Sequence, residues 1–182
     1  PSPEFVPIAP ETLSNSHVRC FFKDSYGYMW IGTEDALVRY DGRHAYRYIN
    51  DPEDNTSIAH NTVNTIIESE DGKLWLGTAQ GLCIYDRELD NFINVDSIPG
   101  NRNYLNNRYI TDLEFDSQGH LWIGTHEGGV NIYDPIKREF RYITYPARGG
   151  VLPSSNFINI LINIQDTIWC ATKGGLLLYD AA

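Results

Sequence analysis

The sequence predicts an all-β protein built from four copies of one short repeat, with essentially no helix. The four tryptophans, Trp30, Trp75, Trp122 and Trp169, are spaced 45, 47 and 47 residues apart. They lie in four matching segments: MWIGT (29–33), LWLGT (74–78), LWIGT (121–125) and IWCAT (168–172). A Tyr-Asp pair follows each tryptophan ten or eleven residues later. Self-similarity at a fixed period of this size indicates a repeat architecture.

Each copy divides into short apolar runs separated by turn residues, which is typical of β-strands. The first run begins at Val18, Val63, Ile110 and Ile158. In three copies an Asp/Gly turn (24–27, 70–72, 116–119) leads to the second run, which carries the tryptophan. The third runs are 37–40, 82–85, 130–133 and 176–179, and the fourth are 46–49, 92–95 and 140–143. No segment keeps an apolar period of 3.6 residues over ten positions, so no helix is expected.

Four antiparallel strands in about 45 residues is the size of one β-propeller blade. We therefore expect a β-propeller of four four-stranded antiparallel blades, forming a single region over residues 1–182. The repeats cover approximately 16–50, 61–96, 109–145 and 157–182. The first two strands are apolar on both faces, as in 157–164, which suits a sheet packed between two neighbours. The tryptophan is expected to fill the space between sheets, as an aromatic side chain with a large buried area.

Glycine follows the tryptophan by two residues in three copies, as Gly32, Gly77 and Gly124. A glycine at this place allows the backbone of a neighbouring blade to approach closely. The fourth copy carries Ala171 instead, and Asp166 stands where its turn glycine is expected. The fourth copy is therefore the most diverged.

The fourth copy also stops after its third strand, while the run FVPI (5–8) precedes the first copy without strands of its own. Residues 5–8 are a candidate for the missing strand, which would close a four-bladed ring and cover its sheet edges. Alternatively they end a preceding blade, the ring is open, and two chains combine into an eight-bladed ring. Because the chain begins Pro-Ser-Pro and ends in mid-pattern, we expect a piece of a longer protein.

The net charge of –10, from 14 basic and 24 acidic residues, argues against nucleic acid and anionic membrane surfaces as partners. Neither a membrane-spanning apolar run nor a signal peptide is recognisable. Eight aspartates recur at turn positions, where their side chains are expected to bind nearby backbone N–H groups. They are Asp24, Asp41, Asp71, Asp86, Asp116, Asp134, Asp166 and Asp180. The three cysteines, Cys20, Cys83 and Cys170, form no CxxC and are expected to be small buried hydrophobic residues.

No catalytic residue, metal site or cofactor is expected. The five histidines (His17, His44, His60, His120 and His126) show no metal-ligand spacing. Neither GxSxG nor a phosphate-binding loop occurs. The Asp-turn-Trp pattern is similar to the Asp-box of sialidases, but its repetition in every blade assigns it to the architecture.

The connections between consecutive copies are long and dissimilar, at 50–61, 96–108 and 144–156. Variable polar loops on a rigid scaffold are where binding residues concentrate. An apolar residue recurs five or six positions before each first strand (Leu13, Ile58, Leu105, Leu152) and is expected to be a structural plug. The candidate ligand-binding residues are His17, Asn61, Arg102, Tyr104, Arg108, Tyr109, His126, Glu127 and Asn156. Planar polar groups beside an aromatic ring suit a sugar. The alternative is that these residues are ordinary solvated surface and the site lies elsewhere.

The string D-x-x-G-x-L-W-I-G-T, continued through a glycine turn to Tyr-Asp and an aromatic strand, resembles the two-component regulator propeller repeat. Residues 116–143 are the closest copy. Residues 13–42 are similar to the start of the sensor region in hybrid two-component systems of gut Bacteroidetes. The resemblance implies a periplasmic, non-enzymatic sensor region that responds to oligosaccharides. It also implies a membrane-anchored parent with a histidine kinase and a DNA-binding regulator, neither of which is present in this chain.

The family usually has more than four repeats, which agrees with a piece of a longer protein. Two other functions stay open. Streptogramin lyases are propellers with similar repeats that use a histidine and a divalent ion, and His126 would be the candidate here. A scaffold or homodimerisation module without a ligand is the other.

Overall fold

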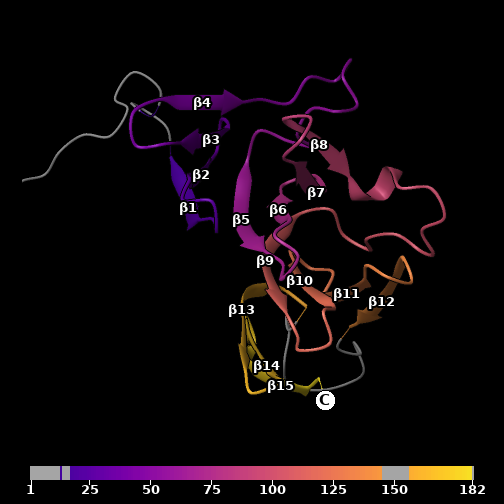
Figure 1. Cartoon of the computed structure of the whole chain (residues 1–182). Helices are drawn as coiled ribbons and strands as arrows, with labels where there is room; N and C mark the ends of the chain where they lie inside the picture. The colour runs from indigo at the N-terminus through magenta and orange to yellow at the C-terminus, as the bar shows by residue number, and fades with distance from the viewer. Residues whose placement is uncertain (1–12, 14–16, 145–155, 182) are drawn as a thin grey trace, which may run out of the picture.

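The computed structural model describes residue 13, residues 17–144 and residues 156–181. Fifteen strands form four antiparallel sheets in chain order, and within residues 17–144 and 156–181 the only helix is the three-residue 3-10 turn η1 (Val95–Ser97). The predicted all-β fold with nearly no helix is confirmed (Figure 1).

Each sheet is one blade, and its strands are neighbours in chain order. Blade 1 contains β1 (Val18–Lys23), β2 (Met29–Thr33), β3 (Leu37–Tyr40) and β4 (Ala45–Tyr48). Blade 2 contains β5 (Val63–Glu68), β6 (Leu74–Thr78), β7 (Gly81–Asp86) and β8 (Asn91–Asn94). Blade 3 contains β9 (Ile110–Phe115), β10 (Leu121–Thr125), β11 (Val130–Asp134) and β12 (Glu139–Ile143). Blade 4 contains β13 (Ile158–Ile164), β14 (Thr167–Thr172) and β15 (Gly175–Asp180). All four predicted starts of the first strand are confirmed.

Blade 4 has three strands within the described residues. The candidate closing strand at 5–8 lies outside the described residues, as does Leu152. The plug residues Ile58 and Leu105 are buried, as predicted.

The threonine that ends each second strand holds the following turn. Its Oγ1 donates a hydrogen bond of 2.8 Å to a backbone carbonyl three or four residues later in every blade. The pairs are Thr33–Ala36, Thr78–Gly81, Thr125–Gly129 and Thr172–Gly175. The repeated Gly-Thr or Ala-Thr pair is therefore an architectural signal.

The turn between the first and second strands holds the tryptophan. Asp24 accepts backbone hydrogen bonds from its own turn and one of 2.8 Å from the indole N–H of Trp30. Asp116 does the same for Trp122 at 2.9 Å. In blade 2 the equivalent residue is Ser69, whose hydroxyl oxygen accepts a hydrogen bond of 3.3 Å from the indole N–H of Trp75.

The prediction for the turn aspartates is therefore right for some positions and wrong for others. Asp41, Asp86 and Asp134 accept backbone N–H groups of their own turns. Asp71 lies two residues beyond the turn position and contacts the Ser69 and Lys73 side chains instead. Asp166, at φ +59° where the other blades have glycine, accepts from Ser117 of blade 3.

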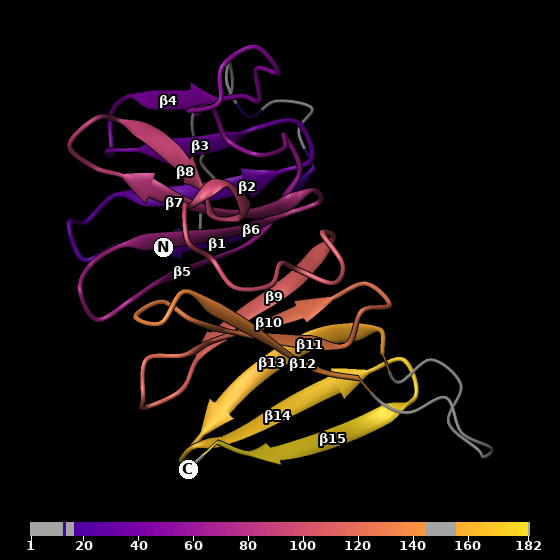
Figure 2. The ribbon, with the colours of Figure 1, turned by 90° about the vertical axis from the view of Figure 1, so that its right-hand side faces the viewer.

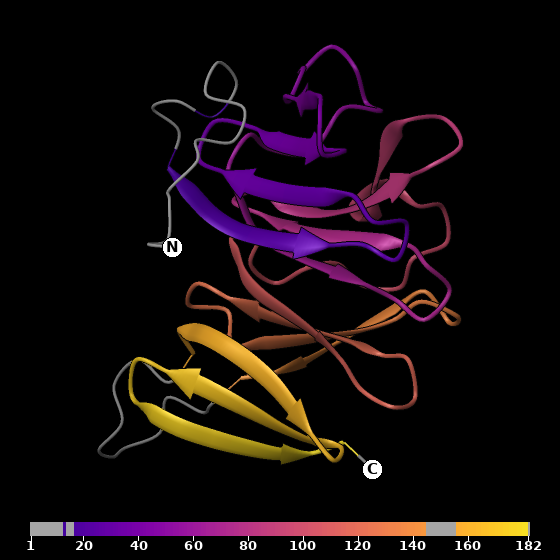
Figure 3. The same cartoon turned by 60° about the vertical axis from the view of Figure 1, so that its left-hand side comes forward.

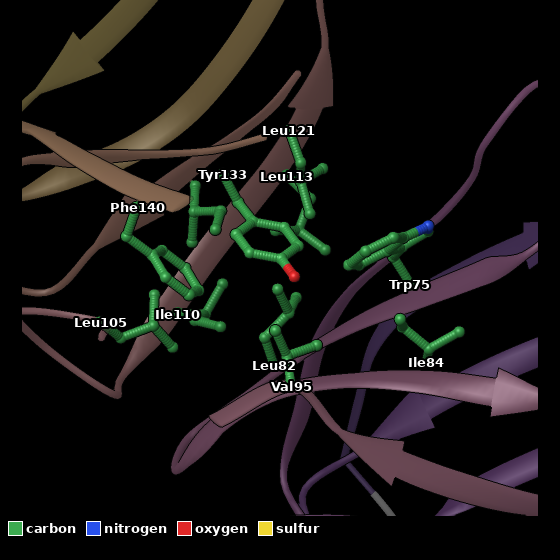
Figure 4. Close-up of a cluster of buried hydrophobic side chains, with 11 residues drawn as sticks. Trp75, Leu82, Ile84, Val95, Leu105, Ile110, Leu113, Leu121, Tyr133 and Phe140 are labelled. Atoms are coloured by element: carbon green, nitrogen blue, oxygen red, sulfur yellow. The ribbon is translucent and has the colours of Figure 1, made fainter. Parts of the chain in front are cut away.

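The core lies between the blades, as Figure 4 shows for blades 2 and 3. Trp75 and Leu82 of blade 2 face Ile110 and Tyr133 of blade 3. The neighbouring blade closely approaches the glycine that follows the tryptophan by two residues in blades 1, 2 and 3. The predicted approach of its backbone is seen at Gly32, where a Cβ would lie 2.7 Å from the Val63 carbonyl oxygen. At Gly77 and Gly124 the approaching atoms are instead side-chain atoms of Ile110 and Ile158, at 2.5 and 2.6 Å.

The three cysteines are free, and they are buried or half-buried as predicted. Cys83 and Cys170 are buried and Cys20 is half-buried. Burial raises the pKa of the Cys20 and Cys83 thiols to about 12 and that of Cys170 to about 11. These thiols therefore stay protonated and serve as small core residues.

The four blades form an arc with their innermost strands β1, β5, β9 and β13 on its concave side (Figure 1). Figures 2 and 3 show the sheets following one another from β1–β4 to β13–β15, with blades 1 and 4 at opposite ends. Neighbouring innermost strands contact one another along the series β1, β5, β9 and β13. In the described residues the arc is open on the side between blades 1 and 4.

A polar hollow at the innermost strands

The concave side of the arc holds a hollow of about 590 Å³, to which all four blades contribute. Its lining residues are His17, Val18, Arg19, Glu34, Asn64, Tyr109, Thr111, His126, Phe157 and Asn159. They come from the start of the innermost strands and from the turns between second and third strands. Both places lie at the same end of every blade, because adjacent antiparallel strands run in opposite directions.

A repeated backbone hydrogen bond builds the rim of the hollow. In every blade the residue after the turn threonine donates its N–H to the carbonyl of the residue before the innermost strand, at 2.9–3.1 Å. The four pairs are Glu34–His17, Ala79–Thr62, His126–Tyr109 and Lys173–Phe157. Each blade therefore presents two side chains at an equivalent place, and the identity of those side chains is free to vary.

The second residue of each innermost strand is polar, although both flanking strand positions are mostly apolar. These residues are Arg19, Asn64, Thr111 and Asn159, and all four line the hollow. Side chains alternate between faces of a strand, so the residues before and after them enter the blade interfaces instead. The expectation that the innermost strands are apolar on both faces is wrong at this position.

Two polar atoms in the wall of the hollow lack a partner among the described residues. They are Asn64 Oδ1 and Thr111 Oγ1. The other end of the Asn64 amide is fixed, since Nδ2 donates to the Ile110 carbonyl at 2.6 Å. Buried polar atoms normally have a hydrogen-bond partner, and leaving one without a partner costs about 1–3 kcal/mol. Both atoms are buried, so two oxygen atoms beside the hollow are left unsatisfied by the described residues.

An aromatic group stands on the side of the hollow formed by blades 3 and 4. The His126 ring lies 4.1 Å from that of Phe157 and 5.3 Å from that of Tyr109, centroid to centroid. The Lys173 ammonium lies 4.4 Å from the centre of the Phe157 ring. These contacts hold the three rings together beside the polar side chains.

The charges on the blade 1 side compensate one another. Arg19 donates to Glu34 Oε1 at 2.8 Å, and His17 Nδ1 lies 3.5 Å from the same oxygen. The hollow therefore has no unpaired arginine on this side to attract an anion.

Of the nine candidate residues, the structure brings His17, Tyr109 and His126 together in the hollow. Asn61 and Arg108 lie elsewhere, because the residues equivalent to His17 are Thr62, Tyr109 and Phe157, one position later. Asn61 Oδ1 accepts from the Asn50 backbone, and Arg108 pairs with Asp96 at 3.1 Å. Asn156 likewise precedes Phe157, and its carbonyl accepts from Gly129.

Arg102 and Tyr104 lie at the outermost strand of blade 3, and Glu127 is not among the residues that line the hollow. Arg102 bridges to Glu139 of β12, and Tyr104 shares hydrogen bonds with Tyr142 of the same outermost strand. The long connection before a blade therefore runs along that blade's outer edge and covers it. Glu127 is exposed in the β10–β11 turn at φ +73°.

Seven lining residues were not among the candidates: Val18, Arg19, Glu34, Asn64, Thr111, Phe157 and Asn159. All of them except the apolar Val18 carry polar or aromatic groups. A signal for the polar ones exists in the sequence. When the four innermost strands are aligned on their first residue, the second position is polar in every copy. A polar residue repeated inside an apolar strand indicates a surface shared by all blades.

Among the described residues no group of three or more His, Cys, Asp or Glu side chains is arranged to hold a metal ion. Within the same residues there is no helix with the length and apolarity needed to cross a membrane.

The sequence profile of the two component regulator propeller family matches three stretches, residues 12–35, 57–80 and 104–127. In these three stretches the chain is similar to two component regulator propeller repeats. Each matched stretch runs from the plug residue through the tryptophan strand to the turn at the hollow. The fourth repeat, which has Ala171 and Asp166 in place of the glycines, is outside the matched stretches.

Histidine kinase P4 of Formosa agariphila is 44% identical over 55 residues, which are 30% of this chain and 4% of that protein. The extracellular domain of a putative hybrid two component system of B. thetaiotaomicron has the same fold, with a TM-score of 0.61 and 20% identity. That likeness covers 97% of this chain and 30% of the other. A second such domain from B. thetaiotaomicron gives a TM-score of 0.55 and 24% identity over 91% of this chain and 26% of the other. The chain thus spans less than a third of either solved domain.

Proposed function

We propose that this chain is part of an extracytoplasmic sensor region of a two-component system, and that the hollow binds a neutral oligosaccharide. The regulator propeller repeats and the likeness to a histidine kinase support the signalling part of the proposal. In this proposal the chain recognises the ligand and performs no chemistry, and the kinase activity belongs to another part of the signalling protein.

The observation that carries the proposal is the ring of polar residues at the second position of the innermost strands. The side chains of Arg19, Asn64, Thr111 and Asn159 all line the hollow. Sugar hydroxyl groups donate and accept hydrogen bonds, so they suit a wall of polar side chains. The adjacent rings of Tyr109, His126 and Phe157 provide apolar faces for the C–H surfaces of a pyranose.

The charge of the protein supports a neutral ligand over an acidic one. The net charge is –10, and Arg19 in the hollow is already paired with Glu34. A uronic acid or a sulfated sugar would meet a repulsive field without an unpaired arginine to hold it.

The test is calorimetric titration of the chain with neutral oligosaccharides of glucose, mannose, xylose and arabinose, and with uronic-acid and sulfated oligosaccharides. We expect saturable binding of at least one neutral sugar. Tyr109→Ala should weaken that binding at least tenfold, a loss of about 1.4 kcal/mol. Tyr104→Ala is the matched control, because Tyr104 lies at the outer edge of blade 3 and its side chain is 60% exposed.

Equal weakening by both tyrosine variants would show that the hollow is not the binding site. Failure of every neutral sugar, together with binding of an acidic one, would contradict the ligand class.

A further inference from the structure

A second pocket, of about 280 Å³, lies between blades 2 and 3. It is lined by the turns that join the first and second strands of both blades and by Pro135 and Ile136, which follow β11. These turns lie at the opposite end of the blades from the hollow, because adjacent strands are antiparallel. The pocket is therefore separate from the proposed sugar site, and its role does not depend on that proposal.

The wall of the pocket is aromatic. The rings of Trp75 and Phe115 line it and lie edge to face, with their centroids 6.2 Å apart. Trp75 also belongs to the core between the two blades, and its indole nitrogen points away from Tyr133 of that core (Figure 4). Pro135 adds a further apolar surface. A group that enters the pocket therefore meets two aromatic rings.

Acidic side chains form the rim of the pocket. Glu70 and Asp71 are both exposed there, and Asp71 is paired with Lys73, the basic residue that lines the pocket. The carboxylates of Glu68 and Asp116 also line it, but each is held by another side chain. Glu70 therefore leaves the rim with a net negative charge. Aromatic rings beside a carboxylate suit a cation.

The equivalent place between blades 1 and 2 is filled by Arg87. Its guanidinium lies 4.2 Å from the centre of the Tyr26 ring, and it donates to Glu68 at 2.9 Å and to the Gly72 carbonyl at 3.1 Å. Arg87 follows the Tyr-Asp pair of blade 2, and the residue at the same place in blade 3 is Pro135. The space that a guanidinium occupies at one interface is thus a pocket at the next.

The groups that hold Arg87 have counterparts in the pocket, exchanged between the two blades. At the first interface the earlier blade supplies a ring, Tyr26, and the later blade supplies a carboxylate, Glu68. At the second interface the residue equivalent to Tyr26 is Asp71, and the residue equivalent to Glu68 is Phe115. The pocket therefore again combines a ring and a carboxylate from opposite blades.

We propose that this pocket binds the guanidinium of an arginine side chain that a partner protein presents. Because a guanidinium is planar, it can stack on the Phe115 ring while its N–H groups donate to Glu70 and Asp71. Ser69 stands where blade 1 has Asp24, and Glu70 beside it supplies a second carboxylate. The net charge of –10 attracts a basic partner to this acidic rim.

The experiment is a nuclear magnetic resonance titration of the 15N-labelled chain with a blocked Gly-Arg-Gly peptide, following the indole N–H signal of Trp75. The matched control ligand is the same peptide with citrulline in place of arginine, which keeps the planar shape and removes the charge. We expect a saturable shift of the Trp75 signal with the arginine peptide, and an affinity for the citrulline peptide that is weaker by about tenfold or more. The indole signal of Trp30 should stay unchanged, because Arg87 already fills its interface.

Pro135→Arg is the most direct variant, since it places an arginine where blade 2 has Arg87. We expect the new side chain to occupy the pocket and to weaken peptide binding by about tenfold or more, whereas the matched control Pro135→Ala should retain it. Glu70→Gln should weaken the arginine peptide by about threefold. Glu53→Gln, the same change in the exposed connection before blade 2, should not. Circular dichroism checks that each variant is folded.

Equal affinities for the arginine and citrulline peptides would overturn the inference, as would the absence of a saturable shift at Trp75. Peptide binding that a folded Pro135→Arg variant leaves unchanged would place the contact elsewhere and overturn it too. Equal effects of the Glu70 and Glu53 variants would show that only the overall charge attracts the peptide, which contradicts a site at this rim.

Discussion

The rings of Trp30 and Tyr85, which belong to adjacent blades, lie edge to face with their centroids 4.7 Å apart. Trp75 with Tyr133 and Trp122 with Tyr179 repeat the contact at 6.0 and 6.1 Å. The tryptophan of one repeat and the Tyr-Asp of the next are thus two halves of one contact. This contact recurs at each of the three interfaces between adjacent blades.

The first prediction concerns two equivalent tryptophans. Trp122→Ala should lower the free energy of unfolding by about 3–5 kcal/mol, because it removes a large side chain from between blades 3 and 4. Trp169→Ala, at the same repeat position on the open face, should cost less than half as much. Chemical denaturation at a concentration where the chain is a single copy measures both. Equal losses would contradict the role of the following blade.

The second prediction concerns the close approach at Gly77. In Gly77→Ala the new methyl group would lie 2.5 Å from Ile110 Cγ2 and 2.6 Å from Thr65 Cγ2, so the blades must separate. We expect a loss of about 1–3 kcal/mol, as for overpacked cores. Ala171→Gly, the reverse change where no described blade follows, should cost less than about 1 kcal/mol. Thermal unfolding of both variants is the measurement, and a neutral Gly77→Ala would be incompatible with the packing described.

The third prediction concerns Arg87, which joins blades 1 and 2. Its guanidinium donates to Asp24 at 2.8 Å and to Glu68 at 2.9 Å. The Asp24 side chain is fully buried; although burial raises the pKa of that carboxyl, its hydrogen bonds from Trp30 and Arg87 hold it below its usual value. Arg87→Ala leaves this carboxylate without its counter-charge and should cost about 2–4 kcal/mol, less than a completely buried pair because Arg87 is 20% exposed.

Lys73 provides the control for Arg87. Its ion pair with Asp71 is 57% exposed on both sides, so Lys73→Ala should change the free energy of unfolding by less than about 1 kcal/mol. Urea denaturation should therefore give a clearly lower free energy of unfolding for the Arg87 variant than for the Lys73 variant. Similar small losses would mean that Arg87 does not hold the blades together.

The fourth prediction concerns pH and Asp112, at the junction of blades 2, 3 and 4. Burial raises the pKa of this carboxyl, and hydrogen bonds from Leu161, Leu113 and Thr65 only partly oppose the shift. A carboxyl with a raised pKa in the folded state binds its proton more tightly there. The protein therefore loses stability as the pH rises from the unfolded pKa, near 3.8, through the higher folded value.

Asp112→Asn removes this contribution. As the pH rises through the acidic range, the wild type should lose free energy of unfolding relative to the variant. The difference between the two proteins should then become constant toward neutral pH. Denaturation curves at a series of pH values measure it. A difference that does not vary with pH would contradict the raised pKa.

The repeat spacing was sufficient to predict the blades, because the residues that recur are those that make the interfaces. Trp75, Gly77 and Tyr133 recur in the sequence because the blade interface to which they belong recurs in the structure. The lining of the hollow was predicted less well. The long connections appear variable, yet Arg102 in one of them lies at an outer edge, while the hollow depends on strand positions such as Asn64.

One residue of register separates two of the candidates from the residues at the hollow. Asn61 and Arg108 precede Thr62 and Tyr109, and successive residues near a strand start point to different sides. When the copies are aligned on the first residue of each innermost strand, the ring of Arg19, Asn64, Thr111 and Asn159 stands out as the polar second position.

The central claim is that the polar ring of the hollow is a sugar-binding surface. The most direct test is a nuclear magnetic resonance titration of the 15N-labelled chain with the neutral oligosaccharides named above, following side-chain amide and indole signals. We predict saturable shifts of the Asn64 and Asn159 side-chain amides, while the Gln118 amide on the opposite end of blade 3 stays unchanged. Saturable binding that shifts Gln118 and leaves both asparagines unchanged would contradict the claim.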